Sequence, residues 1–366
     1  MTEFEPMNAF DPPLGTLTDL EMQSVLLEGV SRTFALTIPQ LPEGLYPVVA
    51  NAYLLCRIVD TIEDEISLSP QLKRDFCGRF IGVVKKTEDA NRFGSELFPM
   101  LSGQTNPAEH ELIRNIPRVI RITHGFTDPQ QTALATCVET MAGGMPQFQN
   151  TGLRDGLKTL QELDRYCYFV AGCVGEMLTR LFCTYSAEIA RHEQRILELS
   201  VSFGQGLQMT NILKDIWDDH QRSVCWLPQD IFAETGFDLA QLSPSHHTPA
   251  FCKGLEALIG IAHSHLKNAL EYTLLIPKSE IGIRYFCLWA LGMAVLTLKK
   301  IKANLYFTSS GQVKISRNAV KSTVLATRIA GRSNLALKAL FMAASHGLGE
   351  NRRQPDRLNK QHLKST

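Results

Sequence analysis

The sequence has 366 residues, 44% of them hydrophobic, which is enough for a large buried core. Basic and acidic residues are equal in number, 37 each, so no global charge attracts nucleic acid or an anionic membrane. The nine cysteines form no CxxC pair and lie mostly in apolar runs, which is typical of thiols that pack as small hydrophobes in a reducing cytoplasm.

The ends of the chain differ from its middle in composition. Residues 1–15 combine acid with proline, so we expect a flexible lead-in and no signal peptide. Residues 346–366 are polar and are expected to form a tail. No repeat or linker divides residues 16–345, which predicts one domain. The longest apolar stretch, Tyr285–Leu298, is too short to span a bilayer, so we expect no transmembrane anchor.

The apolar residues recur with a helical period almost throughout, which predicts an all-α fold. A helix is expected to begin with an N-cap, a proline at N1 and an acid at N3: Asn106, Pro107 and Glu109. Breaks are expected near residues 102–106 and 143–152. The longest irregular insertion is expected at residues 221–249.

Residues 57–65, RIVDTIEDE, gather four acidic side chains in one helical stretch. One face of this helix carries four polar side chains: Tyr53, Arg57, Asp60 and Asp64. Taken alone, the pattern is typical of an amphipathic helix with a solvated face. Because like charges at i and i+4 are unfavourable, a shared cation is the alternative. An i, i+3 ion pair between Arg57 and Asp60 is compatible with both interpretations.

A second segment, residues 206–219, places four polar side chains on one narrow helical stripe: Gln208, Asn211, Asp215 and Asp219. Apolar residues fill most of the remaining circumference, so this stripe is better placed lining a cavity than facing water. Carboxylates in a cavity need compensating cations.

Two DxxxD pairs with amides beside one of them form an oxygen-rich set of side chains of the kind that suits Mg²⁺. This ion binds through few carboxylates, keeps some of its water and takes other ligands from phosphates. The histidine and cysteine spacings typical of zinc sites are absent from the sequence. We therefore predict a site where Mg²⁺ joins a diphosphate to the protein and neutralises charge as a C–O bond breaks.

Five ordered segments resemble the head-to-head trans-isoprenyl diphosphate synthases, over roughly residues 25–330. They are SRTF (31–34), AYLLCRIVDTIED (52–64), YCYFVAGCVGEMLTRLF (166–182), GLQMTNILKDIWDD (206–219) and FCLWALGMAVLTL (286–298). The resemblance implies a single-domain, all-α terpenoid synthase fold. In that fold, helices surround a deep central cavity and the two acidic motifs face each other across its mouth.

The resemblance also implies roles for individual residues. The Mg²⁺ ligands would be Asp60, Glu63, Asp64, Asp215 and Asp219, and these aspartates would also be catalytic. Substrate contacts would come from Ser31, Arg32, Phe34, Tyr53, Arg57, Val170, Gly172, Gln208 and Asn211. A guanidinium group suits the diphosphate role. Tyr166 matches the tyrosine that assists the first ionisation or moves a proton.

Two of these assignments have ordinary structural alternatives. Tyr166 is equally explained as a core tyrosine whose hydroxyl bonds a carbonyl. The small residues of Val170–Gly175 fit close packing of two helices as well as a prenyl chain.

Two positions depart from the family pattern. Relatives often carry an arginine where this chain has Val224, and Arg222 nearby is the substitute we expect. The segment 311–320 resembles the part of the family that contacts NADPH, but Ser316 replaces a usual basic residue. Lys314 and Arg317, together with Asn211 from the cavity stripe, remain the candidates for cofactor binding.

The implied activity is the condensation of two farnesyl diphosphates to presqualene diphosphate, followed by reduction with NADPH to squalene. Phe286 would stabilise the second cation through its ring, whereas core packing is the alternative. Two other classes stay open. One is a non-reducing enzyme that releases dehydrosqualene, phytoene or an alcohol, and the other is a non-catalytic prenyl-binding relative. We expect a cytoplasmic monomer with weak peripheral contact at the inner face of a membrane.

Overall fold

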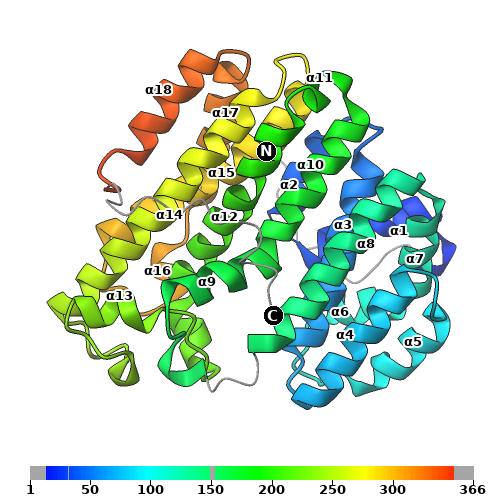
Figure 1. The fold of residues 1–366 in the computed structure, drawn as a ribbon, viewed down its shortest axis with the longest axis horizontal. Coiled ribbons are helices and arrows are strands. Elements are labelled where there is room, and N and C mark those ends of the chain that lie inside the picture. Colours follow the sequence, from blue (N-terminus) through cyan, green and yellow to red (C-terminus); the bar gives the residue numbers. More distant parts are fainter. Residues whose placement is uncertain (1–13, 32, 149–152, 350–366) are drawn as a thin grey trace.

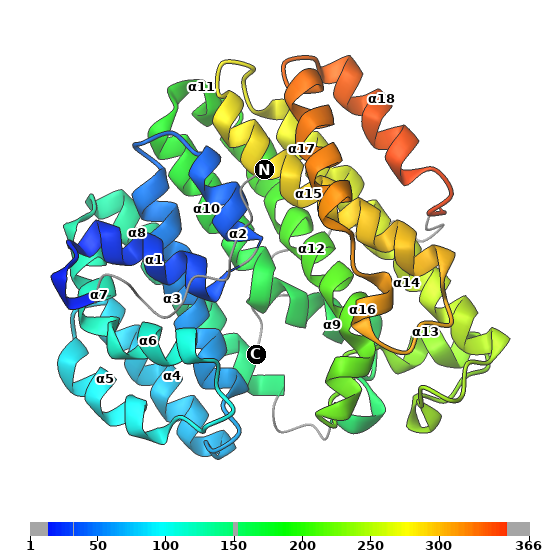
Figure 2. The ribbon, with the colours of Figure 1, turned by 180° about the vertical axis from the view of Figure 1, so that it is seen from behind.

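The computed structural model describes residues 14–31, 33–148 and 153–349, and Figures 1 and 2 show it from two sides. These residues form helices and turns without a strand, and Leu157 and Pro228 make an isolated bridge. The all-α prediction is therefore confirmed. Of the nine cysteines, Cys183 is half-buried and the others are buried, all as free thiols.

The α-helices, in chain order, are α1 (Asp19–Val30), α2 (Phe34–Thr37), α3 (Tyr46–Asp64), α4 (Pro70–Val84), α5 (Ala90–Leu97), α6 (Pro107–Arg114), α7 (Ile116–Gly125), α8 (Asp128–Gly144), α9 (Leu160–Cys167), α10 (Cys173–Tyr185), α11 (Ala187–Ala190), α12 (Glu193–Gln221), α13 (Gln229–Glu234), α14 (Pro249–Leu275), α15 (Ile281–Ala303), α16 (Ser310–Val313), α17 (Arg317–Ala330) and α18 (Asn334–Ser345). A π-helical turn, η6 (Tyr168–Gly172), joins α9 to α10.

Helix α12 runs through the middle of the molecule and contacts α10 on one side and α14 and α15 on the other (Figure 1). Helices α3 and α8 complete the group, and α8 packs against both α3 and α10. Smaller helices cover this group, α4 to α7 at one end and α13, α17 and α18 at the other (Figure 2). Each long helix buries an apolar face, so one continuous core holds the central group together.

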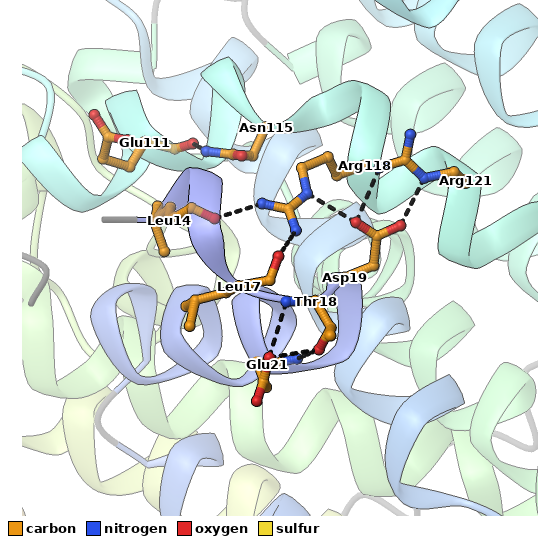
Figure 3. Close-up of polar contacts among 9 residues, drawn as sticks. All are labelled: Leu14, Leu17, Thr18, Asp19, Glu21, Glu111, Asn115, Arg118 and Arg121. Carbon is orange, nitrogen blue, oxygen red and sulfur yellow. Dashed lines mark hydrogen bonds and ion pairs between the residues drawn. The ribbon is translucent and has the colours of Figure 1, made fainter. Parts of the chain in front are cut away.

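The start of the described chain is fixed by an arginine of α7 (Figure 3). Arg118 donates hydrogen bonds to the carbonyls of Leu14 (2.7 Å) and Leu17 (2.6 Å) and to Asp19 (2.8 Å). Arg121 also binds Asp19, and its hydrogen bond holds the pKa of that carboxyl at about 2. Leu14 belongs to the segment predicted as a lead-in, and its side chain is buried.

The start of α6 was predicted more accurately than the irregular segment at residues 221–249. Asn106 Oδ1 accepts the Ala108 N–H at 2.9 Å and α6 begins at Pro107, as predicted. The predicted insertion at residues 221–249 contains α13 and a 3-10 turn, so its description as irregular is partly wrong. The segment is ordered by apolar packing: the ring of Phe232 in α13 stacks on that of Phe251 in α14, with centroids 5.5 Å apart.

One described helix, α15, is long and apolar enough to cross a membrane by length and composition. It has 23 residues, and an 18-residue stretch of it has a mean hydropathy of 1.7, so the apolar stretch predicted from the sequence, Tyr285–Leu298, was too short. In the fold, however, 67% of this 18-residue stretch is buried inside the protein. Its apolar side chains therefore serve the protein core.

Candidate functional site

An apolar cavity of 340 Å³ lies among α2, α3, η6, α10, α12, α14 and α15. The predicted site residues that line it are Phe34, Tyr53, Arg57, Asp60, Val170, Gln208, Asn211 and Phe286. A wider, polar mouth of 800 Å³ adjoins it. The residues shared by both are Arg57, Asp60, Val170, Gln208 and Asn211. The apolar and polar spaces therefore lie side by side.

Two groups of carboxylates lie on opposite walls of the mouth. The last turns of α3 supply Asp60, Glu63 and Asp64, and the end of α12 supplies Asp215, Asp218 and Asp219. Arg222 lies between the walls: its Nη2 donates to Asp219 Oδ1 at 2.6 Å, and its Nη1 lies 3.7 Å from Asp64 Oδ1. The sequence prediction that the two acidic motifs face each other is thus confirmed, and Asp218 is an additional acid.

Three of the carboxylates in the mouth hold their protons more tightly than usual. Burial raises the pKa of Asp60 to about 7, with Asp64 and Glu63 adding to the rise and Arg57 opposing it. Burial likewise raises the pKa of Asp215 and Asp219. Cations in the fold therefore only partly compensate this negative charge, and a bound cation would favour the ionised carboxylates.

The described residues contain no group of three His, Cys, Asp or Glu side chains placed to hold one metal ion together. This arrangement does not match a closed protein cage, such as a structural zinc site. It does fit Mg²⁺, which needs one or two carboxylates and completes its shell with water and phosphate oxygens.

Arg57 is held between two acids at the junction of the cavity and the mouth. It forms a short hydrogen-bonded ion pair with Glu109 of α6 and lies 3.8 Å from Asp60, the predicted i, i+3 pair. Glu109 was recognised in the sequence only as a helix-start acid. No sequence pattern links it to Arg57, because 52 residues separate them.

Tyr166 lines the mouth and is also buried in an aromatic group. Its ring stacks on Trp226 with centroids 3.7 Å apart, and it meets the edge of Phe148 at 5.3 Å. Burial raises its pKa well above the usual value, and Glu63 adds to the rise. The phenol is therefore neutral, and the core-packing interpretation and the site interpretation both describe this residue.

The π-helical turn η6 serves the cavity and the core at once. Val170 lines the cavity, whereas Gly172 lines neither the cavity nor the mouth. A Cβ on Gly172 would lie 2.9 Å from Tyr168, and one on Gly204 would lie 2.1 Å from the Ala171 carbonyl oxygen. Close packing of α12 therefore explains Gly172, as the alternative interpretation of this segment predicted.

Of the substrate contacts predicted near residue 31, some line the cavity and others do not. Phe34 and Tyr53 line the cavity with ring centroids 5.3 Å apart. Ser31 lines neither space, and its Oγ accepts the Phe34 N–H at 2.9 Å, which shapes the start of α2. Arg32 lies outside the described residues.

The two cofactor candidates on the C-terminal side lie on the surface. Lys314 and Arg317 are exposed and line neither the cavity nor the mouth. Their segment is nevertheless tied to the mouth, because Ser310 of α16 donates a 2.7 Å hydrogen bond to Asp218. Phe286 lies away from the mouth, in the apolar part of the cavity, and meets the edge of Phe182 at 6.2 Å.

A buried polar chain supports the helices behind the cavity. Asn268 donates to Ser202 Oγ (2.9 Å), and the same oxygen shares a hydrogen bond with His265 Nδ1 (2.7 Å). His265 Nε2 lies 3.9 Å from Asp164 Oδ1, too far for a hydrogen bond. Burial lowers the pKa of His265 to about 4 and raises that of Asp164 to about 7. Gln205 of α12 donates to the Asp164 carbonyl, which fixes the helix that carries Tyr166.

An apolar cavity whose mouth carries carboxylates on facing helices defines an all-α protein of the terpenoid synthase class. The family model described as squalene/phytoene synthase matches residues 27–319. The chain belongs to this family.

Comparisons with individual proteins agree. The squalene synthase of Eremothecium gossypii is 27% identical over 303 residues, which cover 82% of this chain and 66% of that protein. The squalene synthase of Dictyostelium discoideum is 29% identical over 315 residues, covering 86% and 71%. The solved complex of TcSQS with a ligand has a TM-score of 0.72 at 23% identity, covering 94% of this chain and 95% of that one. The chain thus spans about two thirds of the length of these curated relatives, and the solved structure supports the fold.

Proposed function

We propose that this protein is a Mg²⁺-dependent prenyltransferase that joins two farnesyl diphosphates and reduces the product with NADPH to squalene. The observation that carries the proposal is the pair of carboxylate groups on facing walls at the mouth of an apolar cavity. The relatives named squalene synthase support the reducing activity over the non-reducing one.

The metal would be held by Asp60, Glu63 and Asp64 on one wall and by Asp215 and Asp219 on the other. Bound Mg²⁺ would supply Lewis-acid neutralisation of the diphosphates. The protein's own cations add to this. Arg57 lies where the cavity meets the mouth, so it can contact a diphosphate whose prenyl chain occupies the apolar space.

In the first half-reaction, the C–O bond of one substrate breaks and its diphosphate leaves with the electron pair. The double bond of the second substrate attacks the allylic cation, a proton passes to the released diphosphate, and a cyclopropyl diphosphate forms. Tyr166 is neutral and lines the mouth, so its hydroxyl can donate a hydrogen bond to the departing diphosphate. The apolar cavity walls exclude water, which would trap the cation as an alcohol.

In the second half-reaction, the cyclopropyl diphosphate ionises and the ring rearranges. NADPH would supply the hydride that ends the reaction. Phe286 lines the apolar end of the cavity and can stabilise the rearranging cation through its ring face. We assign Lys314 and Arg317 to the anionic part of NADPH, and Asn211 to its approach at the cavity.

The test is to incubate the purified chain with farnesyl diphosphate and Mg²⁺, with and without NADPH, and to identify the products by mass spectrometry. We expect squalene with NADPH, and presqualene diphosphate, dehydrosqualene or alcohols without it. A hydrocarbon whose rate and identity ignore NADPH would replace this proposal with the dehydrosqualene-type activity. No product in either case would favour the non-catalytic relative.

A further inference from the structure

The neutral total charge of the chain hides a strong segregation of charge along the sequence. From residue 281 to residue 349 there is no Asp or Glu, whereas ten Lys and Arg occur in this segment. Because the chain has 37 basic and 37 acidic residues in total, the rest of it carries 27 basic against 37 acidic residues. One part of the protein is therefore strongly cationic and the remainder is anionic.

The cationic segment includes the hairpin of α17 and α18. Both helices pack on α15, and α18 also contacts α14. Figures 1 and 2 both show the hairpin at one corner of the molecule, outside the central helices. We call the outward face of this hairpin the α17–α18 surface. Its exposed basic and large apolar side chains are Lys321, Leu325, Arg328, Ile329, Arg332, Leu335, Lys338 and Met342.

Large apolar side chains stand open on this surface. Leu325 and Ile329, one turn apart on α17, are 62% and 79% exposed, and Leu335 and Met342 on α18 are 80% and 65% exposed. Elsewhere in the described residues, the exposed large apolar side chains are scattered over several elements: Leu20, Leu36, Ile66, Met100, Tyr185 and Tyr306. A concentration on two adjacent helices indicates an interaction surface.

The cations of the same surface have no acidic partner in the described part of the chain. Lys321, Arg328, Arg332 and Lys338 form no ion pair there. By contrast, Arg79, Arg118 and Arg195, on other faces, each pair with carboxylates. The surface thus combines open apolar groups with uncompensated positive charge.

We propose that the α17–α18 surface binds an anionic phospholipid bilayer. Helices that lie in the membrane interface insert leucine and isoleucine between headgroups while lysine and arginine contact the lipid phosphates, and both requirements are met here on one face. A nucleic acid would use the charge but leave four apolar side chains exposed. A second copy of this surface would bring two sets of cations together.

The surface lies behind a helix that also borders the cavity. Phe286, Cys287 and Ala290 of α15 line the cavity, while Leu288 and Leu291 of the same helix face an apolar groove of 360 Å³ beneath α17 and α18. Helix α15 therefore lies between the cavity and the surface that would bind the bilayer. Binding to lipid does not depend on catalysis, so its test is independent of the proposed activity.

The test is co-sedimentation of the full chain with vesicles. We use neutral phosphatidylcholine alone, and phosphatidylcholine with about 30 mol % phosphatidylserine or phosphatidylglycerol. We expect binding to the anionic vesicles, at least about tenfold weaker binding to the neutral ones, and release at about 0.5 M salt. The double variant Lys321→Glu with Lys338→Glu should reduce binding to anionic vesicles at least about tenfold.

Matched variants separate this surface from general charge and apolarity. Lys158→Glu with Lys253→Glu makes the same change in net charge on other elements and should bind vesicles as the wild type does. Ile329→Ser with Leu335→Ser should weaken vesicle binding, whereas Leu20→Ser on α1 should not. Equal loss in the matched variants, or no vesicle binding at all, would overturn the proposal. Self-association in sedimentation velocity that Ile329→Ser with Leu335→Ser abolishes, without vesicle binding, would assign the surface to a second copy instead.

Discussion

Arg222 and Asp219 form a 2.6 Å hydrogen-bonded ion pair at the end of α12, and the same guanidinium lies 3.7 Å from Asp64 of α3. One cation thus joins the two acidic walls of the mouth. Relatives often carry an arginine at the position of Val224, two residues further on. Position 224 of this chain lacks the positive charge of the family pattern, and Arg222 brings a positive charge to the same wall of the mouth.

The first prediction concerns this cation. Arg222→Gln should raise the KM for farnesyl diphosphate about tenfold, because a charge-assisted contact to a diphosphate is lost. Adding Val224→Arg to Arg222→Gln should restore most of the affinity, since it returns a guanidinium to the same wall. Steady-state kinetics of both variants check this. Unchanged KM in Arg222→Gln would show that the arginine only screens the carboxylates.

The second prediction concerns the two acidic walls. Asp60→Asn and Asp219→Asn should each leave folding intact and slow turnover at least about a hundredfold, near 2.7 kcal/mol of transition-state stabilisation. The physical reason is the loss of a carboxylate that would hold Mg²⁺. Asp75→Asn, on the exposed side of α4, is the control. Circular dichroism and product formation are measured together, and near wild-type activity in both site variants would contradict the assignment.

The acidic walls could be predicted from the sequence because each is a local helical pattern. Asp60 with Asp64, and Asp215 with Asp219, are spaced so that a single helix puts them on one face. Their meeting across the mouth followed from the family resemblance, since no periodicity relates two separate helices. The structure supplies the contact, through Arg222.

Other features could not be predicted from the sequence, because they depend on how separate segments pack. The residues of η6 form a π-helical turn, which the apolar pattern did not predict; within it Gly172 packs on Val201, whereas Val170 lines the cavity. The pairing of Arg57 with Glu109 depends on how α6 packs on α3. The outward placement of Leu325 and Ile329 depends on which face of α17 meets α15, which the apolar pattern alone does not decide.

The third prediction tests Glu109 as a positioning residue. Glu109→Gln removes the charge that holds Arg57, so the KM for farnesyl diphosphate should rise about tenfold with a smaller change in kcat. Glu111→Gln is the matched control, because Glu111 lies on the same helix and pairs with the exposed Arg114. A fall in thermal stability with unchanged KM would show that the pair is structural only.

The fourth prediction concerns acid stability. His265 has a pKa near 4 in the folded chain, against about 6.5 when unfolded, so between these values the unfolded state binds more protons. This residue should therefore reduce the free energy of unfolding as the pH falls from 6.5 to 4, by up to about 3 kcal/mol. Asp164, whose pKa is raised to about 7, acts in the opposite direction.

Comparison of the wild type with His265→Gln isolates the histidine. Urea unfolding at several pH values should show a stability difference that shifts in favour of the variant as the pH falls from 6.5 to 4, with little further change at neutral pH. A difference that is constant over this range would mean that His265 does not change its protonation on unfolding.

The fifth prediction separates the two half-reactions. Phe286 is buried at the apolar end of the cavity, away from the carboxylates of the mouth, and its ring meets the edge of Phe182. If its ring stabilises the rearranging cation, Phe286→Ala should slow the second ionisation more than the first. Presqualene diphosphate should then accumulate relative to squalene, by about tenfold in the product ratio.

A matched variant tests whether cavity shape alone explains this change. Phe182→Ala removes a ring of equal size from the same wall, and Phe286→Leu keeps apolar volume without the aromatic face. A role for the π-face requires that Phe286→Leu still accumulates the intermediate while Phe182→Ala slows both half-reactions alike. If Phe286→Leu behaves as the wild type does, the ring fills space and the cation is stabilised elsewhere, because leucine restores packing but has no quadrupole.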